Sequence, residues 1–231
     1  MKNARYIILL ILFALTLSLH AQTDVGEQMK RYADEYANCE DTQSRQKLAN
    51  NFFTYLQQID YIDEPIAFPD GSHIDSVDVN VYYYVAEWYY GEGDYQSAIN
   101  YCTRATSYMG VVDDISKSDV YGLLGAAYFR QGAFDKAAKT LNRCYELDKK
   151  AGDFDRMSST LNGIASVFVA AGKPEEAEKY ILEAIAANSL TENLTRRAVL
   201  YGTTSEIYLS MGDAQQSLDF AKKALASVPR P

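Results

Sequence analysis

Four glycines recur at a nearly constant interval and constrain the fold of this chain more than any other feature. Gly93, Gly132, Gly172 and Gly212 lie 39, 40 and 40 residues apart. A small residue stands seven positions before each glycine (Ala86, Gly125, Ala165 and Ser205) and five positions after it (Ala98, Ala137, Ala177 and Ser217). An aromatic residue stands four positions before it (Tyr89, Tyr128, Phe168 and Tyr208). Columns that recur in register over such a period indicate internal structural repeats.

Each repeat has the pattern of an antiparallel helix pair. The glycine ends the first helix, because it adopts a left-handed turn that other residues enter only at a cost. The small residues let the two helices approach closely, and the aromatic residue fills the space between them. One pair cannot bury its apolar face alone, so stacked pairs share a continuous core. We predict an all-α, right-handed α-solenoid with about four full repeats, over residues 79–117, 118–157, 158–197 and 198–228.

This pattern resembles the tetratricopeptide repeat (TPR) family, over roughly residues 79–228. The opening position of that repeat holds Tyr82, Tyr121, Leu161 and Tyr201, and the next aliphatic position holds Val85, Leu124 and Ile164, with Thr204 as a departure in the last copy. The family period is about 34 residues. The surplus here is expected in the loops at residues 110–118 and 150–155 or in a longer end of the second helix. The resemblance implies a scaffold that binds peptides or proteins in a concave groove.

The part of the chain before the repeats reads as a divergent repeat. Residues 25–38 and 44–61 carry apolar side chains at helical spacing, without the glycine column. We interpret residues 22–61 as a divergent helix pair or N-terminal cap, residues 62–78 as an ordered connector rich in turn residues, and residues 229–231 as a tail. A signal, a helix pair and such a connector before the repeats also resemble, loosely, the sensory region of exported TPR-containing histidine kinases or transcriptional regulators.

The first 21 residues have the layout of a secretory signal. Lys2 and Arg5 precede an apolar run from Tyr6 to Leu19, which is too short to cross a bilayer as a helix. We expect cleavage after Ala21 and a periplasmic or secreted protein, with no membrane insertion afterwards. Leu19 is not the small residue that cleavage favours, so a membrane-anchored, uncleaved form is the alternative.

Composition argues against nucleic-acid binding and against catalysis. The 31 acidic and 22 basic residues give a formal charge of −9, which repels phosphates. His73 lies between Asp70 and Asp75, but these residues lack the spacing of known calcium or zinc sites. No nucleophile has a histidine base at motif spacing and no glycine-rich phosphate loop occurs. We therefore expect no enzyme activity, no metal and no cofactor.

Two of the three cysteines, Cys102 and Cys144, fall within apolar helix patterns. A free buried thiol behaves as a small hydrophobic side chain, and this is the favoured interpretation for both. A disulfide between them stays open, because neighbouring helices meet the required geometry only in a narrow set of registers.

The groove is expected on the side chains of each first helix that point away from the second. These are Asn80, Tyr83, Tyr84, Glu87, Tyr90, Leu123, Phe129, Arg130, Asn162, Ser166, Thr203 and Glu206. Arg130 is the only cation assigned to this surface, so the lysine and asparagine clamp that the family uses for C-terminal carboxylates is absent. The aromatic residues suit a peptide with apolar anchors. Alternatively, Tyr83, Tyr84 and Tyr90 pack against the preceding helix pair.

These features predict a non-enzymatic module that binds a protein or peptide. The alternative is the sensor domain of a longer signalling protein, with a small ligand in the groove. The last helix, near residues 214–228, carries Leu218, Phe220, Ala221, Leu225 and Val228, more apolar residues than one packing face can bury. We expect that it docks against further repeats, another copy or a partner.

Overall fold

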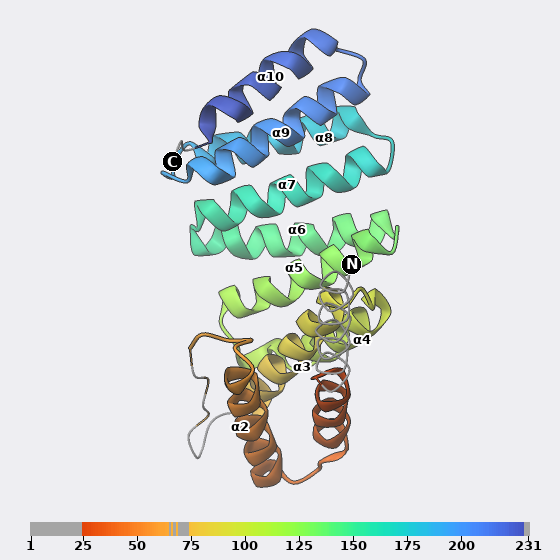
Figure 1. Ribbon diagram of the computed structural model, residues 1–231, viewed down its shortest axis with the longest axis vertical. Coiled ribbons are helices and arrows are strands. Elements are labelled where there is room, and N and C mark those ends of the chain that lie inside the picture. Colours follow the sequence, from red (N-terminus) through yellow and green to blue (C-terminus); the bar gives the residue numbers. More distant parts are fainter. Residues whose placement is uncertain (1–24, 65, 67, 69–73, 229–231) are drawn as a thin grey trace, which may run out of the picture.

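The computed structural model describes residues 25–64, 66, 68 and 74–228. The regular elements of this part are helices, stacked in sequence order along one axis (Figure 1). A helix over residues 25–38 is followed by α2 (Thr42–Gln58), α3 (Ile74–Gly91), α4 (Tyr95–Thr106), the short 3-10 helix η1 (Met109–Val111), α5 (Asp114–Arg130), α6 (Phe134–Ala151), α7 (Phe154–Ala170), α8 (Pro174–Asn188), α9 (Leu194–Ser210) and α10 (Ala214–Ser227). The predicted all-α solenoid is confirmed.

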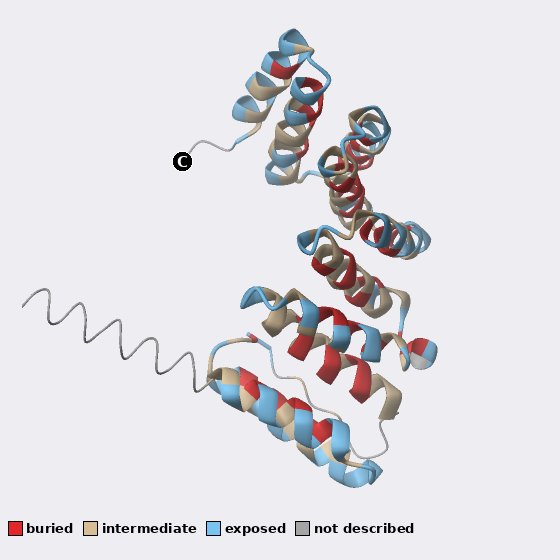
Figure 2. Ribbon diagram, turned by 90° about the vertical axis from the view of Figure 1, so that its right-hand side faces the viewer, coloured by how far each residue is buried: buried red, intermediate tan, exposed pale blue. Residues whose placement is uncertain are grey.

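From α3 onward the helices form four successive pairs. Each first helix packs against its own second helix, and that second helix packs against the first helix of the next pair. The first helices α3, α5, α7 and α9 also contact one another directly, whereas contacts of that extent are not found between successive second helices in the described residues. Closer spacing of the first helices places them on the inner side of the bowed array in Figure 2.

The glycine and aromatic columns belong to one turn motif. Gly172 has φ +73 and follows α7, and the N–H of Lys173 then donates to the carbonyl of Phe168 at 2.9 Å. This left-handed residue with its backward hydrogen bond satisfies a carbonyl that the helix end would leave unpaired. The same bond, also at 2.9 Å, joins Asp213 to Tyr208 after Gly212. The constant four-residue interval between the aromatic residue and the glycine in these repeats is therefore set by backbone geometry.

The second pair shows how closely the helices approach at a small residue. A Cβ atom built on Gly125 would lie 2.6 Å from Cγ of Leu141 on α6. The aromatic column stacks on a ring of the second helix: Phe168 on Tyr180 at 5.3 Å and Tyr208 on Phe220 at 5.5 Å. The first pair has the same stack, Tyr89 on Tyr101 at 5.5 Å. In the second pair the equivalent position holds Thr140, and the ammonium of Lys136 lies 5.5 Å from the centre of the Tyr128 ring.

The residues by which each repeat exceeds the family period of about 34 lie mainly within the helices. The first helices of the four pairs begin at Ile74, Asp114, Phe154 and Leu194, four or five residues before the boundaries expected from the repeat. Only two residues separate α6 from α7, so the expected loop at residues 150–155 is mostly helical. Residues 74–78 of the expected connector form the first turn of α3. In the N-terminal pair, α2 ends at Gln58, three residues before its expected end.

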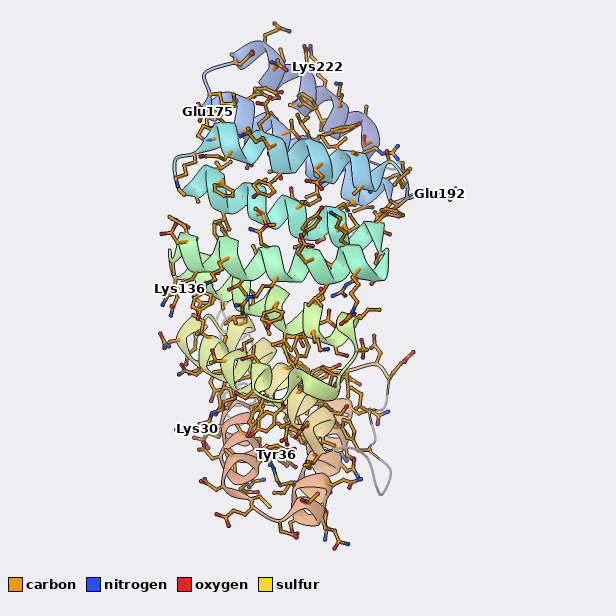
Figure 3. All side chains as sticks on the ribbon, turned by 180° about the vertical axis from the view of Figure 1, so that it is seen from behind. Lys30, Tyr36, Lys136, Glu175, Glu192 and Lys222 are labelled. Atoms are coloured by element: carbon orange, nitrogen blue, oxygen red, sulfur yellow. The ribbon has the colours of Figure 1, made fainter. Side chains whose placement is uncertain are left out.

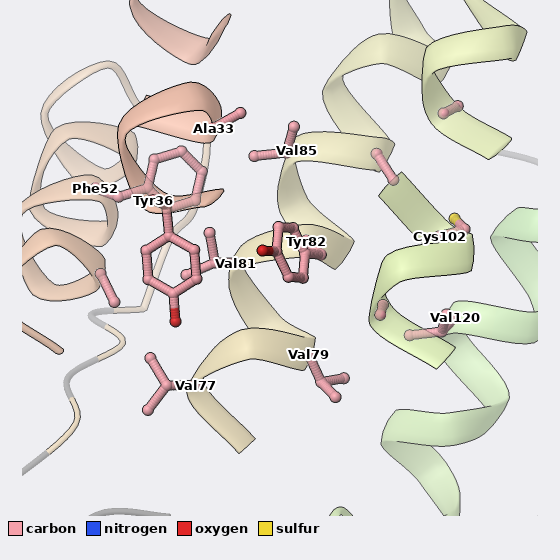
Figure 4. Close-up of a cluster of buried hydrophobic side chains, with 14 of the residues drawn as sticks. Ala33, Tyr36, Phe52, Val77, Val79, Val81, Tyr82, Val85, Cys102 and Val120 are labelled. Carbon is pink, nitrogen blue, oxygen red and sulfur yellow. The ribbon is translucent and has the colours of Figure 1, made fainter. Parts of the chain in front are cut away.

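A buried ionic cluster attaches the N-terminal pair to α3. Tyr36 Oη donates to Oδ1 of Asp78 at 2.5 Å, and the guanidinium of Arg45 lies 2.8 Å from the same oxygen. Arg45 also covers the Tyr36 ring at 4.9 Å. Around this cluster, Tyr36 and Val77 belong to an apolar core that extends through α3 to α4 and α5 (Figure 4).

The outer side of α10 carries exposed apolar residues. Leu218 is 50% exposed, Leu225 78% and Val228 54%. Phe220 does not belong to this strip, because it stacks inward on Tyr208. The expectation that α10 docks against another copy or a further repeat stays a prediction.

The expectations about the signal and about membrane insertion concern different parts of the chain. The proposed signal at residues 1–21 lies outside the described residues. Within the described part of the chain, no helix has the length and apolarity to cross a bilayer.

Candidate functional site

The first helices carry all twelve residues assigned to the groove. They are distributed as Asn80, Tyr83, Tyr84, Glu87 and Tyr90 on α3, Leu123, Phe129 and Arg130 on α5, Asn162 and Ser166 on α7, and Thr203 and Glu206 on α9. Arg130 and Glu206 are exposed and the others are partly buried. Exposed charged residues of the second helices, such as Lys136 and Glu175, project into solvent from other parts of the array (Figure 3).

Tyr83, Tyr84 and Tyr90 of α3 are all partly buried and pack against the N-terminal apolar core. The Tyr84 ring packs edge-on against Phe53 of α2 at 5.4 Å, so the alternative interpretation holds for Tyr84. Tyr83 Oη donates to Oε1 of Glu87 at 3.2 Å. Burial raises the pKa of the Glu87 carboxyl, and the nearby carboxylate of Asp119 raises it further. This end of the inner surface is therefore acidic and only partly open.

Tyr90 and Arg130 join the ends of two first helices. Arg130 Nε donates to Tyr90 Oη at 3.4 Å, and the Tyr90 ring lies 5.5 Å from Tyr95. Arg130 is exposed, so this weak hydrogen bond lies in contact with solvent.

A polar cluster centred on Asp148 occupies the middle of the array. The Asp148 carboxylate is buried and accepts hydrogen bonds from Ser118, from Thr160 Oγ1 at 2.7 Å and from Arg156 Nε at 3.1 Å. Arg156 Nη2 donates in addition to Asp119 Oδ1 at 2.7 Å. These bonds join α5, α6 and α7, and they hold the Arg156 guanidinium at the inner surface.

Cys144 belongs to the same cluster, which differs from its expected role as an apolar spectator. Its Sγ lies 3.1 Å from Ser118 Oγ and 3.4 Å from Thr160 Oγ1. Burial raises the pKa of the thiol, so it stays protonated at neutral pH. Cys102 is also buried, and both cysteines are free thiols.

The Asp148 cluster forms the wall of a pocket of about 320 Å³. Its lining comes from four helices and comprises Ser118, Asp119, Gly122, Cys144, Asp148, Asp155, Arg156, Ser159, Thr160 and Arg196. The Nε atom of Arg196 is buried without a hydrogen-bond partner. We call this the Arg196 pocket.

The α9 part of the inner surface carries two exposed apolar side chains together with the exposed Glu206. Val199 is 47% exposed and Leu209 64%, while Thr203 between them donates back to the Val199 carbonyl at 3.3 Å. The residues assigned to the surface on α7, Asn162 and Ser166, are polar, so exposed apolar side chains return on this surface only at α9.

Sequence reasoning missed Arg156, Arg196 and Asp148 as candidate site residues. The two arginines stand sixteen positions before Gly172 and Gly212, so alignment on the glycine column brings them together. They were not assigned because they precede the expected helix starts at residues 158 and 198. Asp148 was missed because it is followed by two lysines and reads as a solvated helix end.

Metal binding has no candidate among the described residues. These residues contain no group of three or more histidine, cysteine, aspartate or glutamate side chains that could hold an ion. Of the three residues weighed from the sequence, His73 and Asp70 lie outside the described residues, and Asp75 begins α3.

Comparisons with known proteins agree with this geometry. Residues 78–150 and 156–229 match the family described as Tetratricopeptide repeat. Among curated proteins, no sequence matches this chain.

Among solved structures, the TPR-like repeats of a putative kinesin light chain from Podosopora anserina align with TM-score 0.60 and 14% identity, over 88% of this chain and 94% of that one. The apo form of RapI aligns with TM-score 0.63 and 15% identity, over 89% and 61%. The Rap conjugation gene regulator of plasmid pLS20, solved with the Phr* peptide, aligns with TM-score 0.60 and 13% identity, over 87% and 63%. The chain thus spans less than two thirds of these two Rap proteins, and the likeness is one of fold. Since the family match covers more than half of the residues, the chain belongs to the tetratricopeptide repeat family.

Proposed function

We propose that this protein is a non-enzymatic scaffold that binds an extended peptide segment of a partner protein along its inner surface. The observation that carries the proposal is the exposure of Val199 and Leu209 on α9, the helix that also contributes Arg196 to the polar pocket. Apolar anchors next to a few polar groups are typical of peptide-binding surfaces. The fold neighbour solved with the Phr* peptide supports the proposal by analogy of fold.

A display library of random peptides, selected on the full chain, supplies the probe that tests this proposal. We expect Leu209→Asp to weaken the selected peptide at least tenfold, about 1.4 kcal/mol, because it places a charge where an apolar anchor binds. Leu182→Asp is the matched control, since Leu182 is 46% exposed but lies on the second helix α8. Isothermal titration calorimetry measures both affinities. Equal affinities for the two variants would contradict binding at the inner surface.

We also propose that the protein is exported from the cytoplasm. The support is the sequence of residues 1–21, with Lys2 and Arg5 before a short apolar run. The intact mass of the exported protein is expected to correspond to residues 22–231. A membrane-bound protein that retains Met1 would instead indicate an uncleaved anchor.

A further inference from the structure

Arg196 and Arg156 occupy equivalent positions in successive repeats. Each is the third residue of a first helix, since α7 begins at Phe154 and α9 at Leu194. Both side chains line the Arg196 pocket. The third repeat therefore provides an internal reference for how this structure surrounds such a guanidinium.

In that reference, Arg156 is neutralised by two carboxylates. Its Nε donates to Asp148 at 3.1 Å and its Nη2 to Asp119 at 2.7 Å. Asp148 is 1% exposed, and Asp119 lies on the inner side of α5. The pattern is a cation held between one buried acid and one acid at the groove.

One repeat later, both acids are replaced by neutral residues. The positions forty residues after Asp119 and Asp148 are Ser159 and Asn188. Asn188 is buried, and its Nδ2 donates to Thr191 Oγ1 at 3.0 Å and to the Asn193 carbonyl at 3.2 Å. Its amide is thus committed to the turn between α8 and α9 and supplies no charge to Arg196.

Arg196 consequently lacks the two carboxylate contacts that Arg156 makes. Its Nε is buried without a hydrogen-bond partner, and no ion pair to it is found among the described residues. A buried donor without a partner destabilises the folded state, and a charged donor does so more than a neutral one. A planar guanidinium meets this need best with a carboxylate, which can accept two parallel hydrogen bonds.

We propose that Arg196, with the hydroxyl of Ser159 beside it, binds a carboxylate group of the ligand. The two oxygens of the carboxylate take the places that Asp148 and Asp119 fill at Nε and Nη2 of Arg156 in the preceding repeat. The pocket wall also carries Asp155 and the two acids that pair with Arg156, so its five charged side chains sum to −1. Their field opposes a doubly charged phosphate more strongly than a singly charged carboxylate, which depends on its direct contact with Arg196. This inference rests on the proposed function, the binding of a ligand at the inner surface. It adds that the ligand carries a carboxylate at this point.

Arginine Nε–H signals in ¹⁵N–¹H correlation spectra of the full chain report directly on the site. The probes are N-acetylalanine, which carries a carboxylate, and N-acetylalaninamide, which is its neutral match. We expect a saturable shift of the Arg196 signal, assigned by its loss in Arg196→Lys, with the acid and none with the amide. Arg130, an exposed cation on α5, is the internal control and should not shift saturably.

A second variant tests the site without removing the arginine. Ser159→Asp recreates the acid of the preceding repeat, so it should abolish the response to N-acetylalanine and raise Tm by about 2 °C through the new ion pair. The proposal is overturned by the absence of a saturable shift, by equal shifts at Arg130 and Arg196, or by a response that survives Ser159→Asp.

The selected peptides separate this proposal from the proposed function. Peptides that bind equally well with their carboxylates neutralised, and equally well to Arg196→Gln, would overturn the carboxylate site while peptide binding stands. A saturable Arg196 shift with N-acetylalanine, in a protein that selects no peptide from the library, would support the site for a small carboxylate ligand and contradict peptide binding. At least a tenfold loss of peptide affinity on neutralising the carboxylate would support both.

Discussion

Gly125→Leu is expected to lower Tm by about 6 to 12 °C, corresponding to about 3 kcal/mol of unfolding free energy. Even a Cβ at this position would lie 2.6 Å from Cγ and 2.7 Å from Cδ2 of Leu141. A leucine must therefore displace Leu141 or push α5 and α6 apart. Thermal unfolding followed by circular dichroism measures the effect.

Gly202→Ala is the matched control for this substitution. Gly202 is also a helical glycine of a first helix, but a Cβ built on it meets no atom within 4 Å. Alanine there should leave Tm unchanged or raise it slightly, because it lowers the entropy of the unfolded chain and favours the helix. Equal melting temperatures for Gly125→Leu and Gly202→Ala would show that the repeat register is wrong.

Asp148→Asn is expected to cost about 2 to 4 kcal/mol. The carboxylate accepts from Ser118, Thr160 and Arg156, and asparagine would turn an amide donor toward some of these donors. Loss of these hydrogen bonds should weaken the packing of the second helix pair against the third, which Asp148 joins. Urea unfolding of the variant measures the change in free energy.

Glu146→Gln is the control for this variant, because Glu146 lies on the same helix α6 and is exposed. It should stay within about 0.5 kcal/mol of the original protein. A stability of Asp148→Asn equal to that of Glu146→Gln would mean that the Asp148 cluster does not hold the pairs together.

The glycine column allowed the array to be predicted, because it reports a local backbone requirement. A residue such as Gly172, at φ +73, is needed wherever a first helix ends and turns, whatever ligand the protein binds. The small and aromatic columns follow from the same geometry. The starts of the first helices were harder to predict, since residues 74–78 follow a connector rich in turn residues and lack a column of their own.

The candidate site was only partly predictable for a different reason. Side chains such as Tyr84 can face either the groove or the preceding pair, and the choice depends on Phe53, which is distant in sequence. Asp148 and Arg156 become a buried cluster only through the packing of three helices. From sequence alone, charged residues are expected to be exposed to solvent. The partners that let them be buried are brought together only by the tertiary structure.

The central claim is that ligands bind to the first helices of the array. Hydrogen exchange of the full chain, with and without a peptide selected on it, tests this claim most directly. Binding at the inner surface predicts slower exchange in α5, α7 and α9, with little change in the outward amides of α6 and α8. Protection confined to the second helices, or to α10 alone, would contradict the account.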